Sequence, residues 1–248
     1  MPTMYPRLAY EDQKALLDRI VSRCKGVPGA ASPVVVFDLD GTLMENRPRT
    51  LAILRELGEV WRTKEPALAE RLVAAQPTQL SYLLSTSLAN LGITRTELVA
   101  EAELFWRERF FVDGYLKHDV EVPGAGDFAR ACYDAGAVLV YFTGRDLPLM
   151  GLGSFASLRD LGFPIGVPGT ELVCKPDAAM PDEAYKRLVG PSLTRVGHVV
   201  AVFDNEPGNC NVLFTHFPDA DSVMVDTQHL PGAPELLREV HVIADFKR

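Results

Sequence analysis

The stretch VVVFDLDGTL, residues 34–43, decides the fold. Residues 34–37 form a short, continuous apolar run, which is typical of a strand buried on both faces of a parallel sheet. The run stops abruptly at two carboxylates, Asp38 and Asp40. Ligands of an open parallel sheet bind beyond the carboxyl ends of its strands. The two carboxylates are therefore expected at a binding site, although an Asp-Gly pair is also common in simple turns.

The same pattern of an apolar run with a polar end returns further along the chain. The later runs are AVLVYFTGR at 137–145, ELVCKPD at 171–177, HVVAVFDNEPGN at 198–209 and SVMVDT at 222–227. Helical periodicity or helix-ending glycines between the runs predict helices over 10–24, 123–136, 147–161 and 181–189. Strands that alternate with helices predict an α/β fold, a Rossmann-like doubly wound parallel sheet.

One long segment, residues 47–118, interrupts this alternation. It is rich in Leu, Ala, Glu and Arg, with breaks at Pro66, Pro77 and Gly92, and it contains no strand pattern. We predict helices over 49–62, 66–75, 78–91 and 95–111. The expected organisation is a core made of residues 1–46 and 119–248, with an α-helical insertion at 47–118.

Composition restricts the classes of partner. The formal net charge of −8 argues against a general role in coating nucleic acid, which requires a basic face. No stretch is apolar and long enough to span a bilayer, and the N-terminal residues contain no apolar signal region. The expected protein is soluble and cytoplasmic and has no nucleic-acid or membrane partner.

The four cysteines, Cys24, Cys132, Cys174 and Cys210, lack metal-ligand spacing. We interpret them as reduced thiols in or near the core, which fits a reducing compartment.

The polar strand ends together suggest phosphate chemistry. The carboxyl ends of parallel strands meet at one edge of a sheet, so we expect the polar strand ends to lie together there. These residues are Asp38, Asp40, Thr143 with Gly144, Lys175, and Asp204 with Asn205 and Glu206. Several carboxylates suit Mg²⁺, which takes a few carboxylate oxygens together with water and substrate phosphate oxygens. A threonine hydroxyl can donate to a phosphoryl oxygen, and a lysine can neutralise charge on it. A carboxylate can attack phosphorus, which splits one hard step into two easier ones.

Four motifs in this order resemble those of the haloacid dehalogenase superfamily. They are FDLDGTL at 37–43, FTGR at 142–145, CKPD at 174–177 and VFDNEP at 202–207. The resemblance implies that Asp38 is the nucleophile. It also implies that Asp40 protonates the leaving oxygen and then deprotonates the attacking water. Thr143, with Gly144, would bind the phosphoryl group, and Lys175 would hold both Asp38 and the phosphoryl oxygens.

The resemblance further implies a Mg²⁺ site. Its ligands would be Asp38, the backbone carbonyl of Asp40, and Asp204 or Asn205. The last motif departs from the commonest forms of the family, because Asn205 directly follows Asp204. Which of Asp204, Asn205 and Glu206 contacts the metal therefore stays open at this point. Glu206 can instead favour the start of a helix.

Two features narrow the implied reaction. An aspartate at position 40 resembles the phosphatase branch, since an alkoxide leaving group needs a proton. The insertion resembles the mobile cap of this superfamily, and caps that close over a pocket favour small substrates. The expected activity is Mg²⁺-dependent hydrolysis of a small phosphorylated metabolite, a phosphomonoester, through an aspartyl-phosphate. The alternatives are a phosphomutase of the same superfamily and a non-catalytic protein that binds a phosphorylated ligand.

Several further residues have competing interpretations. Arg145 can bind substrate or pair with a structural carboxylate. Arg47 and Arg49 are interpreted as part of a solvated face, although they could also meet an anionic substrate. A cluster of aromatic residues near the end of the insertion is interpreted as its core: Phe105, Trp106, Phe110 and Phe111.

Overall fold

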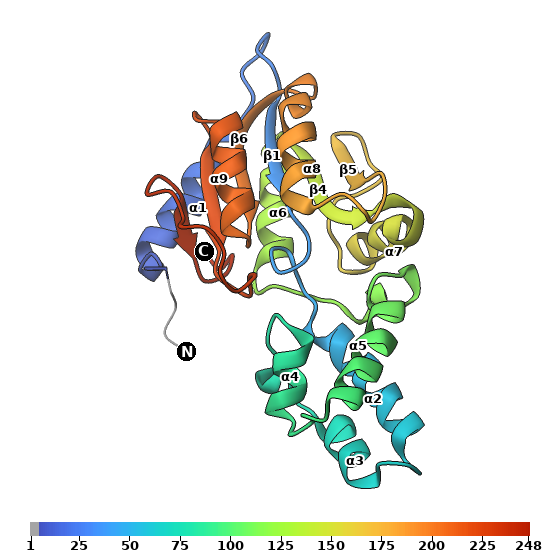
Figure 1. Ribbon diagram of the computed structural model, residues 1–248. Helices are drawn as coiled ribbons and strands as arrows, with labels where there is room; N and C mark the ends of the chain where they lie inside the picture. The colour runs from blue at the N-terminus through green and yellow to red at the C-terminus, as the bar shows by residue number, and fades with distance from the viewer. Residues whose placement is uncertain (1–4) are drawn as a thin grey trace.

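A six-stranded parallel sheet forms the centre of the larger unit (Figure 1). The computed structural model describes residues 5–248. Residues 1–4, the first residues of the expected core segment 1–46, lie outside the described residues. The strand order is β5-β4-β1-β6-β7-β8. In chain order the strands are β1 (Pro33–Phe37), β4 (Val138–Asp146), β5 (Thr170–Lys175), β6 (His198–Asp204), β7 (Asp221–Val225) and β8 (His241–Ile243). The predicted α/β fold is confirmed.

Helices cover both faces of the sheet. Side chains alternate along β1, so Val35 and Phe37 enter the hydrophobic cluster on one face while Val34 and Val36 enter the cluster on the other. The first face carries α1 (Tyr10–Arg23), α6 (Ala125–Asp134) and α7 (Leu147–Asp160). The second carries α8 (Asp182–Val189), the short helix η3 (Gly190–Arg195) and α9 (Pro207–His216). Burial on both faces explains why β1 reads as a continuous apolar run.

A smaller helical unit projects from one edge of the sheet (Figure 1). Two short antiparallel strands, β2 (Met44–Glu45) and β3 (Val120–Glu121), lie where the chain leaves the larger unit and where it returns. Between them lie α2 (Arg47–Trp61), α3 (Pro66–Ala74), η1 (Pro77–Gln79), α4 (Leu84–Asn90), α5 (Thr96–Phe110) and η2 (Asp113–His118). These helices bury a cluster of their own, which includes Leu54, Trp61 and Leu88.

The prediction of a single helix over 78–91 is wrong. A short 3-10 turn at 77–79 is followed by an extended segment, and α4 begins only at Leu84. The Ser87 hydroxyl lies 2.9 Å from the backbone nitrogen of Ser81, which donates to it. That hydrogen bond satisfies a backbone group that a continuous helix would otherwise use. The extended segment 80–83 consequently reaches toward the larger unit, where the Gln228 side chain donates to the Leu80 carbonyl.

Among residues 5–248, no helix is both long enough and apolar enough to cross a lipid bilayer.

Candidate active site

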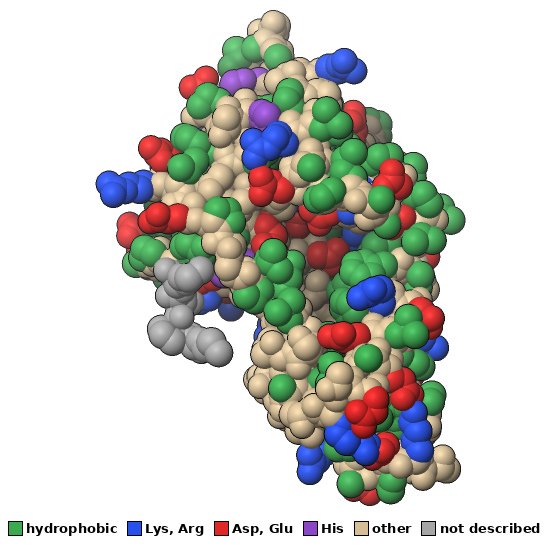
Figure 2. All heavy atoms as spheres, in the orientation of Figure 1, with side chains coloured by type: hydrophobic (Ala, Val, Ile, Leu, Met, Phe, Trp, Pro, Cys, Tyr) green, Lys and Arg blue, Asp and Glu red, His purple; other side chains and the backbone are tan. Residues whose placement is uncertain are grey.

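A cavity of about 420 Å³ lies between the carboxyl edge of the sheet and the helical unit. Figure 2 shows it as a recess between the two units, with acidic side chains inside it. Asp38 and Thr143 line it from the larger unit, and so does Asn205. The parallel sheet therefore gathers three of its polar strand ends around one hollow, as their positions in the sequence predicted.

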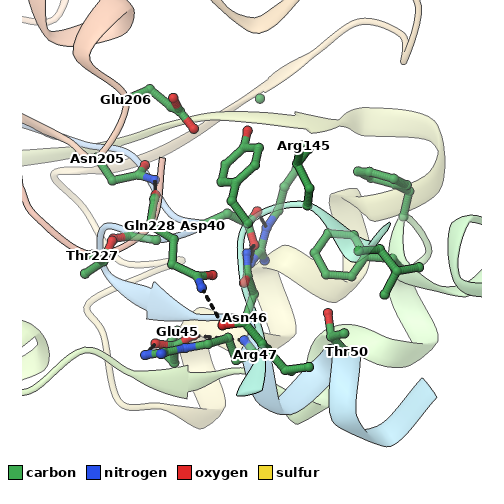
Figure 3. Close-up of a pocket in the computed structure, with 18 of the residues that line it drawn as sticks. Asp40, Glu45, Asn46, Arg47, Thr50, Arg145, Asn205, Glu206, Thr227 and Gln228 are labelled. Atoms are coloured by element: carbon green, nitrogen blue, oxygen red, sulfur yellow. Dashed lines mark hydrogen bonds and ion pairs between the residues drawn. The ribbon is translucent and has the colours of Figure 1, made fainter. Parts of the chain in front are cut away.

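The loop after β1 requires a glycine. Gly41 has a φ of +78°, and a Cβ added there would lie 2.4 Å from Nδ2 of Asn205. The Asn205 side chain accepts a hydrogen bond from the Thr42 hydroxyl at 3.3 Å and donates one to the Gln228 carbonyl at 2.5 Å. Asn205 thus holds the loop that carries both predicted catalytic carboxylates against the C-terminal segment (Figure 3).

A buried lysine joins Asp38 to Asp204. Lys186 of α8 donates from Nζ to Oδ1 of Asp38 at 2.8 Å and to Oδ2 of Asp204 at 2.5 Å. All three side chains are buried, with 9% or less exposed. An unpaired charge is costly in such a site. One ammonium between two carboxylates makes the close approach of the carboxylates possible.

The three buried charges perturb one another. Burial raises the pKa of Asp38 to about 7, because the opposing effect of the Lys186 ammonium is incomplete and the Asp204 carboxylate adds to the rise. For Lys186, the two carboxylates outweigh burial and raise the pKa above its ordinary range. The lysine is therefore positively charged at neutral pH, and the group carries a net charge of about −1 when both carboxylates are ionised.

Lys175, the lysine expected to hold Asp38, lies elsewhere. It ends β5, and its Nζ donates to Oδ1 of Asp182 at 2.7 Å and to the Met180 carbonyl at 2.9 Å. Within residues 5–248, the hydrogen bonds of Lys175 all go to this neighbouring turn and none goes to Asp38. The difference arises because β5 is the outer strand of the sheet, whereas α8 packs over the sheet beside β4.

Oxygen ligands for a hard cation are available beside Asp38. The structure gives Oδ2 of Asp38 no hydrogen-bond partner among residues 5–248. Oδ1 of Asp204 accepts from the backbone nitrogen of Glu206 at 2.9 Å and from Asn209 at 3.2 Å, while Oδ2 accepts from Lys186. No group of three His, Cys, Asp or Glu side chains converges as a metal cage within the described chain. Two carboxylates with backbone oxygen suit Mg²⁺, which keeps several waters, better than they suit a cation that needs a full protein cage.

The other two candidate ligands have different partners. Glu206 accepts from the backbone nitrogen of Leu230 through both carboxylate oxygens, at 3.2 and 3.1 Å. The amide of Asn205 is engaged by Thr42 and Gln228, as described above. Asp204 is engaged as well and its side chain is fully buried, whereas Asn205 and Glu206 line the cavity, so the geometry does not select one of the three as the metal ligand.

Thr143 and Gly144 lie at the end of β4 and line the cavity. The Thr143 hydroxyl oxygen accepts from the backbone nitrogen of Arg145 at 3.2 Å, which leaves its hydrogen free to donate. A Cβ at position 144 would lie 2.2 Å from Oδ2 of Asp182, so a side chain there would clash with that carboxylate. The two residues thus offer a hydroxyl donor beside a half-buried glycine backbone that lines the cavity, as a phosphoryl group requires.

Asp40 is held by two buried arginines. Arg145 donates to its carboxylate from Nε at 2.6 Å and from Nη2 at 3.0 Å, and Arg49 donates from Nη2 at 2.6 Å. Both arginines also pair with Asp119, which accepts from Arg49 at 2.5 and 2.8 Å and from Arg145 at 2.7 Å. We call these four side chains the arginine quartet: Asp40, Arg49, Asp119 and Arg145. The expected solvated position of Arg49 is wrong, since its side chain is 0% exposed.

The arginine quartet keeps Asp40 ionised. Burial alone would raise the pKa of Asp40, but the guanidinium groups of Arg145 and Arg49 outweigh it and hold the pKa well below its usual range. In this arrangement Asp40 is ionised, but the same arginines make it a weak base, so accepting a proton would require it to loosen these contacts. To donate one, as the resemblance implies for the first step, it would have to loosen its contacts with the arginines. Arg145 therefore pairs with carboxylates, which was one of its two expected roles.

We expect Asp119→Asn to destabilise the protein by about 3–5 kcal/mol, because it leaves two buried guanidinium groups with a single carboxylate partner. The free energy of unfolding from urea titration measures this loss. Asp127→Asn is the matched control, since its pair with Arg130 is 82% exposed on the aspartate side. Its effect should stay within about 0.5 kcal/mol. Equal effects of the two substitutions would contradict the structural role of the arginine quartet.

The aromatic cluster of α5 divides between two environments. Phe105 packs against the core of the helical unit, as expected. Trp106 contacts that core too, but it also lines the cavity together with Phe110 and Phe111. The interpretation of this cluster as core alone is therefore wrong.

From the other side of the cavity, Tyr82 approaches Glu206, and partial burial together with that carboxylate raises the pKa of Tyr82.

Several important residues had no usable signal in the sequence. Lys186 lies on a helix rich in charged residues, where a lysine is expected to be solvated, and Asp119 lies between motifs. Tyr82 lies within the helix expected over 78–91, so its position in the cavity was hidden by that error. A buried charge is recognised only once its partner is known, and these partners are distant in the chain.

Comparison with known proteins identifies the fold. No protein-family model and no curated protein matches the chain. A solved structure described as a candidate phosphatase from Clostridium difficile matches with a TM-score of 0.52 and 16% identity, over 84% of this chain and 93% of that one. Protein Tyrosine Kinase A from Mycobacterium tuberculosis matches with a TM-score of 0.51 and 16% identity, over 85% and 93%.

A third match is described as a candidate haloacid dehalogenase-like hydrolase from Burkholderia xenovorans LB400. It has a TM-score of 0.49 and 18% identity, over 86% of this chain and 93% of that one. Identities this low describe a likeness of fold. The chain has the α/β fold expected from its resemblance to the haloacid dehalogenase superfamily.

Proposed function

We propose that the protein is a Mg²⁺-dependent phosphatase that hydrolyses a small phosphomonoester through an aspartyl-phosphate on Asp38. The observation that carries the proposal is the buried Asp38–Lys186–Asp204 group, of which Asp38 lines the cavity. Lys186 holds one oxygen of Asp38 and leaves the other without a partner among the described residues. A carboxylate oriented in this way is suited to attack phosphorus.

The chain's own residues account for the remaining requirements. The Thr143 hydroxyl and the backbone at Gly144 bind phosphoryl oxygens, and the Lys186 ammonium offsets their charge. Asp38, the Asp40 carbonyl and Asp204 would hold Mg²⁺, and Asn205 remains a predicted fourth ligand. When bound, the ion supplies positive charge to the transferring phosphoryl group. Asp40 would give a proton to the leaving alkoxide oxygen as the aspartyl-phosphate forms and take one from the water that then attacks the acyl phosphate; in both steps it would have to loosen its pairs with Arg49 and Arg145.

The names of the matched structures include both a phosphatase and a kinase, and each name applies to the protein that carries it. For this chain, the acceptor of the phosphoryl group separates the candidates. Release of inorganic phosphate indicates a phosphatase. A phosphorylated sugar as product indicates the phosphomutase alternative, and binding without turnover indicates a non-catalytic protein.

We expect a chelator to reduce phosphate release from a general phosphomonoester such as 4-nitrophenyl phosphate by about a hundredfold or more, since metal charge stabilises phosphoryl transfer by several kcal/mol. Excess Mg²⁺ should restore the rate. Ca²⁺ should restore it poorly, because it favours larger and looser coordination. Inorganic phosphate is measured under each condition. Full turnover in excess chelator would rule out the metal site described here.

A further inference from the structure

We infer that the helical side of the cavity binds an aromatic ring carried by the alcohol part of the phosphomonoester. This inference rests on the proposed function and adds the class of substrate. Three side chains at the end of α5 carry it: Trp106, Phe110 and Phe111, which we call the aromatic wall.

The aromatic wall is one continuous surface. The rings of Trp106 and Phe110 are stacked, with centroids 4.3 Å apart and planes 28° apart. Phe111 meets both edge-on, at 5.0 Å from Phe110 and 5.6 Å from Trp106. The Phe111 side chain is nevertheless 41% exposed. The wall therefore presents unsatisfied ring surface to the cavity, and burial of that surface by a ligand is favourable.

The wall is held in place from behind. The Trp106 indole nitrogen donates to the Thr50 hydroxyl at 3.1 Å. The Arg49 guanidinium lies 4.3 Å from the centroid of Phe110 and donates to the Phe110 carbonyl at 3.2 Å. These contacts fix two rings of the wall against α2. A fixed wall loses little conformational entropy when a ligand binds.

The opposite sides of the cavity differ in chemistry, and this difference orients the ligand. Asp38 and Thr143 face it from the sheet, so the phosphate belongs there. The wall faces it from α5, so an apolar group belongs there. The helical side also contributes polar residues to the lining, Arg47, Thr50, Glu103 and Arg107, so the preference for a ring rests on the three aromatic side chains. An aromatic ring meets the wall in the stacked or edge-on arrangements that the wall itself already shows.

The size of the cavity agrees with such a ligand. Its volume of about 420 Å³ falls within the range of small-molecule sites, roughly 300–1,000 Å³. A single ring joined to a phosphate by a short linker fits this space.

The test compares alkyl phosphates whose leaving groups are chemically similar, so that differences report binding of the remote group. We expect kcat/KM for 2-phenylethyl phosphate to exceed that for ethyl phosphate by about ten- to two-hundredfold. It should exceed that for 2-cyclohexylethyl phosphate by about two- to tenfold, because aromatic pairs gain more than their buried area provides. Equal kcat/KM values for the phenyl and ethyl esters would overturn the inference.

Variants connect the preference to the wall. Phe111→Ala should reduce the ratio of kcat/KM values for 2-phenylethyl and ethyl phosphate by about tenfold, whereas Phe111→Leu, which keeps apolar volume, should reduce it less. Leu104→Ala is the matched control, since Leu104 lies on α5, which Phe111 directly follows, is 59% exposed and does not line the cavity. It should leave the ratio unchanged. An unchanged ratio in Phe111→Ala would contradict the role of the wall.

A binding measurement separates this inference from the proposed function. Calorimetry with 2-phenylethylphosphonate and ethylphosphonate, in the presence of Mg²⁺, reports ring recognition without hydrolysis. Tighter binding of the phenyl compound without turnover of its phosphate ester would support the wall and reject the phosphatase. Turnover of all esters with no preference in binding would support the phosphatase and reject the wall. Neither binding preference nor turnover would reject both.

Discussion

Asp38→Asn is expected to lower kcat by about four orders of magnitude or more, which is the scale of loss when a covalent nucleophile is removed. An amide has nearly the shape of the carboxylate but cannot form the acyl phosphate. Phosphate release, together with acid-quench trapping of labelled phosphoenzyme, measures the effect. Retention of more than about a hundredth of the wild-type rate would contradict covalent catalysis by Asp38.

The stability of the same variant shows whether the loss has another cause. The pKa of Asp38 is about 7 in the folded protein against an ordinary value of 3.8. Between these values the folded state binds more protons than the unfolded state, so the contribution of Asp38 to stability is lost as pH rises. The amide in the variant does not titrate. In metal-free buffer, the stability of Asp38→Asn relative to wild type should therefore rise from about pH 4 to pH 7 and then level off. A variant that is unfolded under the assay conditions would indicate that the lost activity has a structural cause.

Lys186→Met should lower kcat/KM by about a hundred- to a thousandfold, as expected when a fixed donor to the reacting group is lost from a buried site. Methionine fills similar space, but the substitution leaves Asp38 and Asp204 close together without the ammonium. Their mutual repulsion should raise the apparent pKa in the pH profile of kcat/KM. A purely structural lysine would lower the amount of folded enzyme without moving that profile.

Lys175→Met is the decisive comparison. The resemblance assigned the catalytic lysine to position 175, whereas the structure brings the Lys186 ammonium onto Asp38. We expect Lys175→Met to retain activity within about tenfold, because it breaks a pair whose aspartate, Asp182, is 55% exposed. A loss in Lys175→Met equal to that in Lys186→Met would restore the assignment made from the sequence.

The contrast between these two lysines illustrates what the sequence could predict. Asp38 follows β1, Thr143 lies in the last part of β4 and Asp204 ends β6, so the geometry of the parallel sheet brings them to one edge. Lys175 also ends a strand, but β5 is the outer strand, and the same argument misleads there. Lys186 reaches the site from a helix, whose rotation over the sheet depends on packing that no local pattern contains.

The sequence predicts the boundaries of long helices well and those of short strands poorly. Long periodic segments such as α1, α2 and α5 were predicted to within two residues of their ends. The strands β2, β3 and β8 have only two or three residues each. Such strands are too short to show a period of two and exist because a neighbouring segment supplies their hydrogen bonds. The extended segment 80–83 was missed for a related reason, since its Leu80 carbonyl bonds to the distant Gln228 side chain. The helix α9 was not predicted, although Glu206 and Pro207 at its start are local signals of a helix N-terminus.

The arginine quartet has a mechanical consequence. Asp40 belongs to the larger unit, Arg49 to the first helix after one connection, and Asp119 to the other connection. A motion of the helical unit that preserves these ion pairs must turn about them, so the quartet acts as a pivot. Groups at the pivot keep their neighbours, while groups far from it travel furthest. On that geometry, opening the cavity would separate Tyr82 from Glu206 while Arg49 stays on Asp40. The entrance of the cavity would then move furthest, whereas Asp40, the predicted proton-transfer residue, would move least.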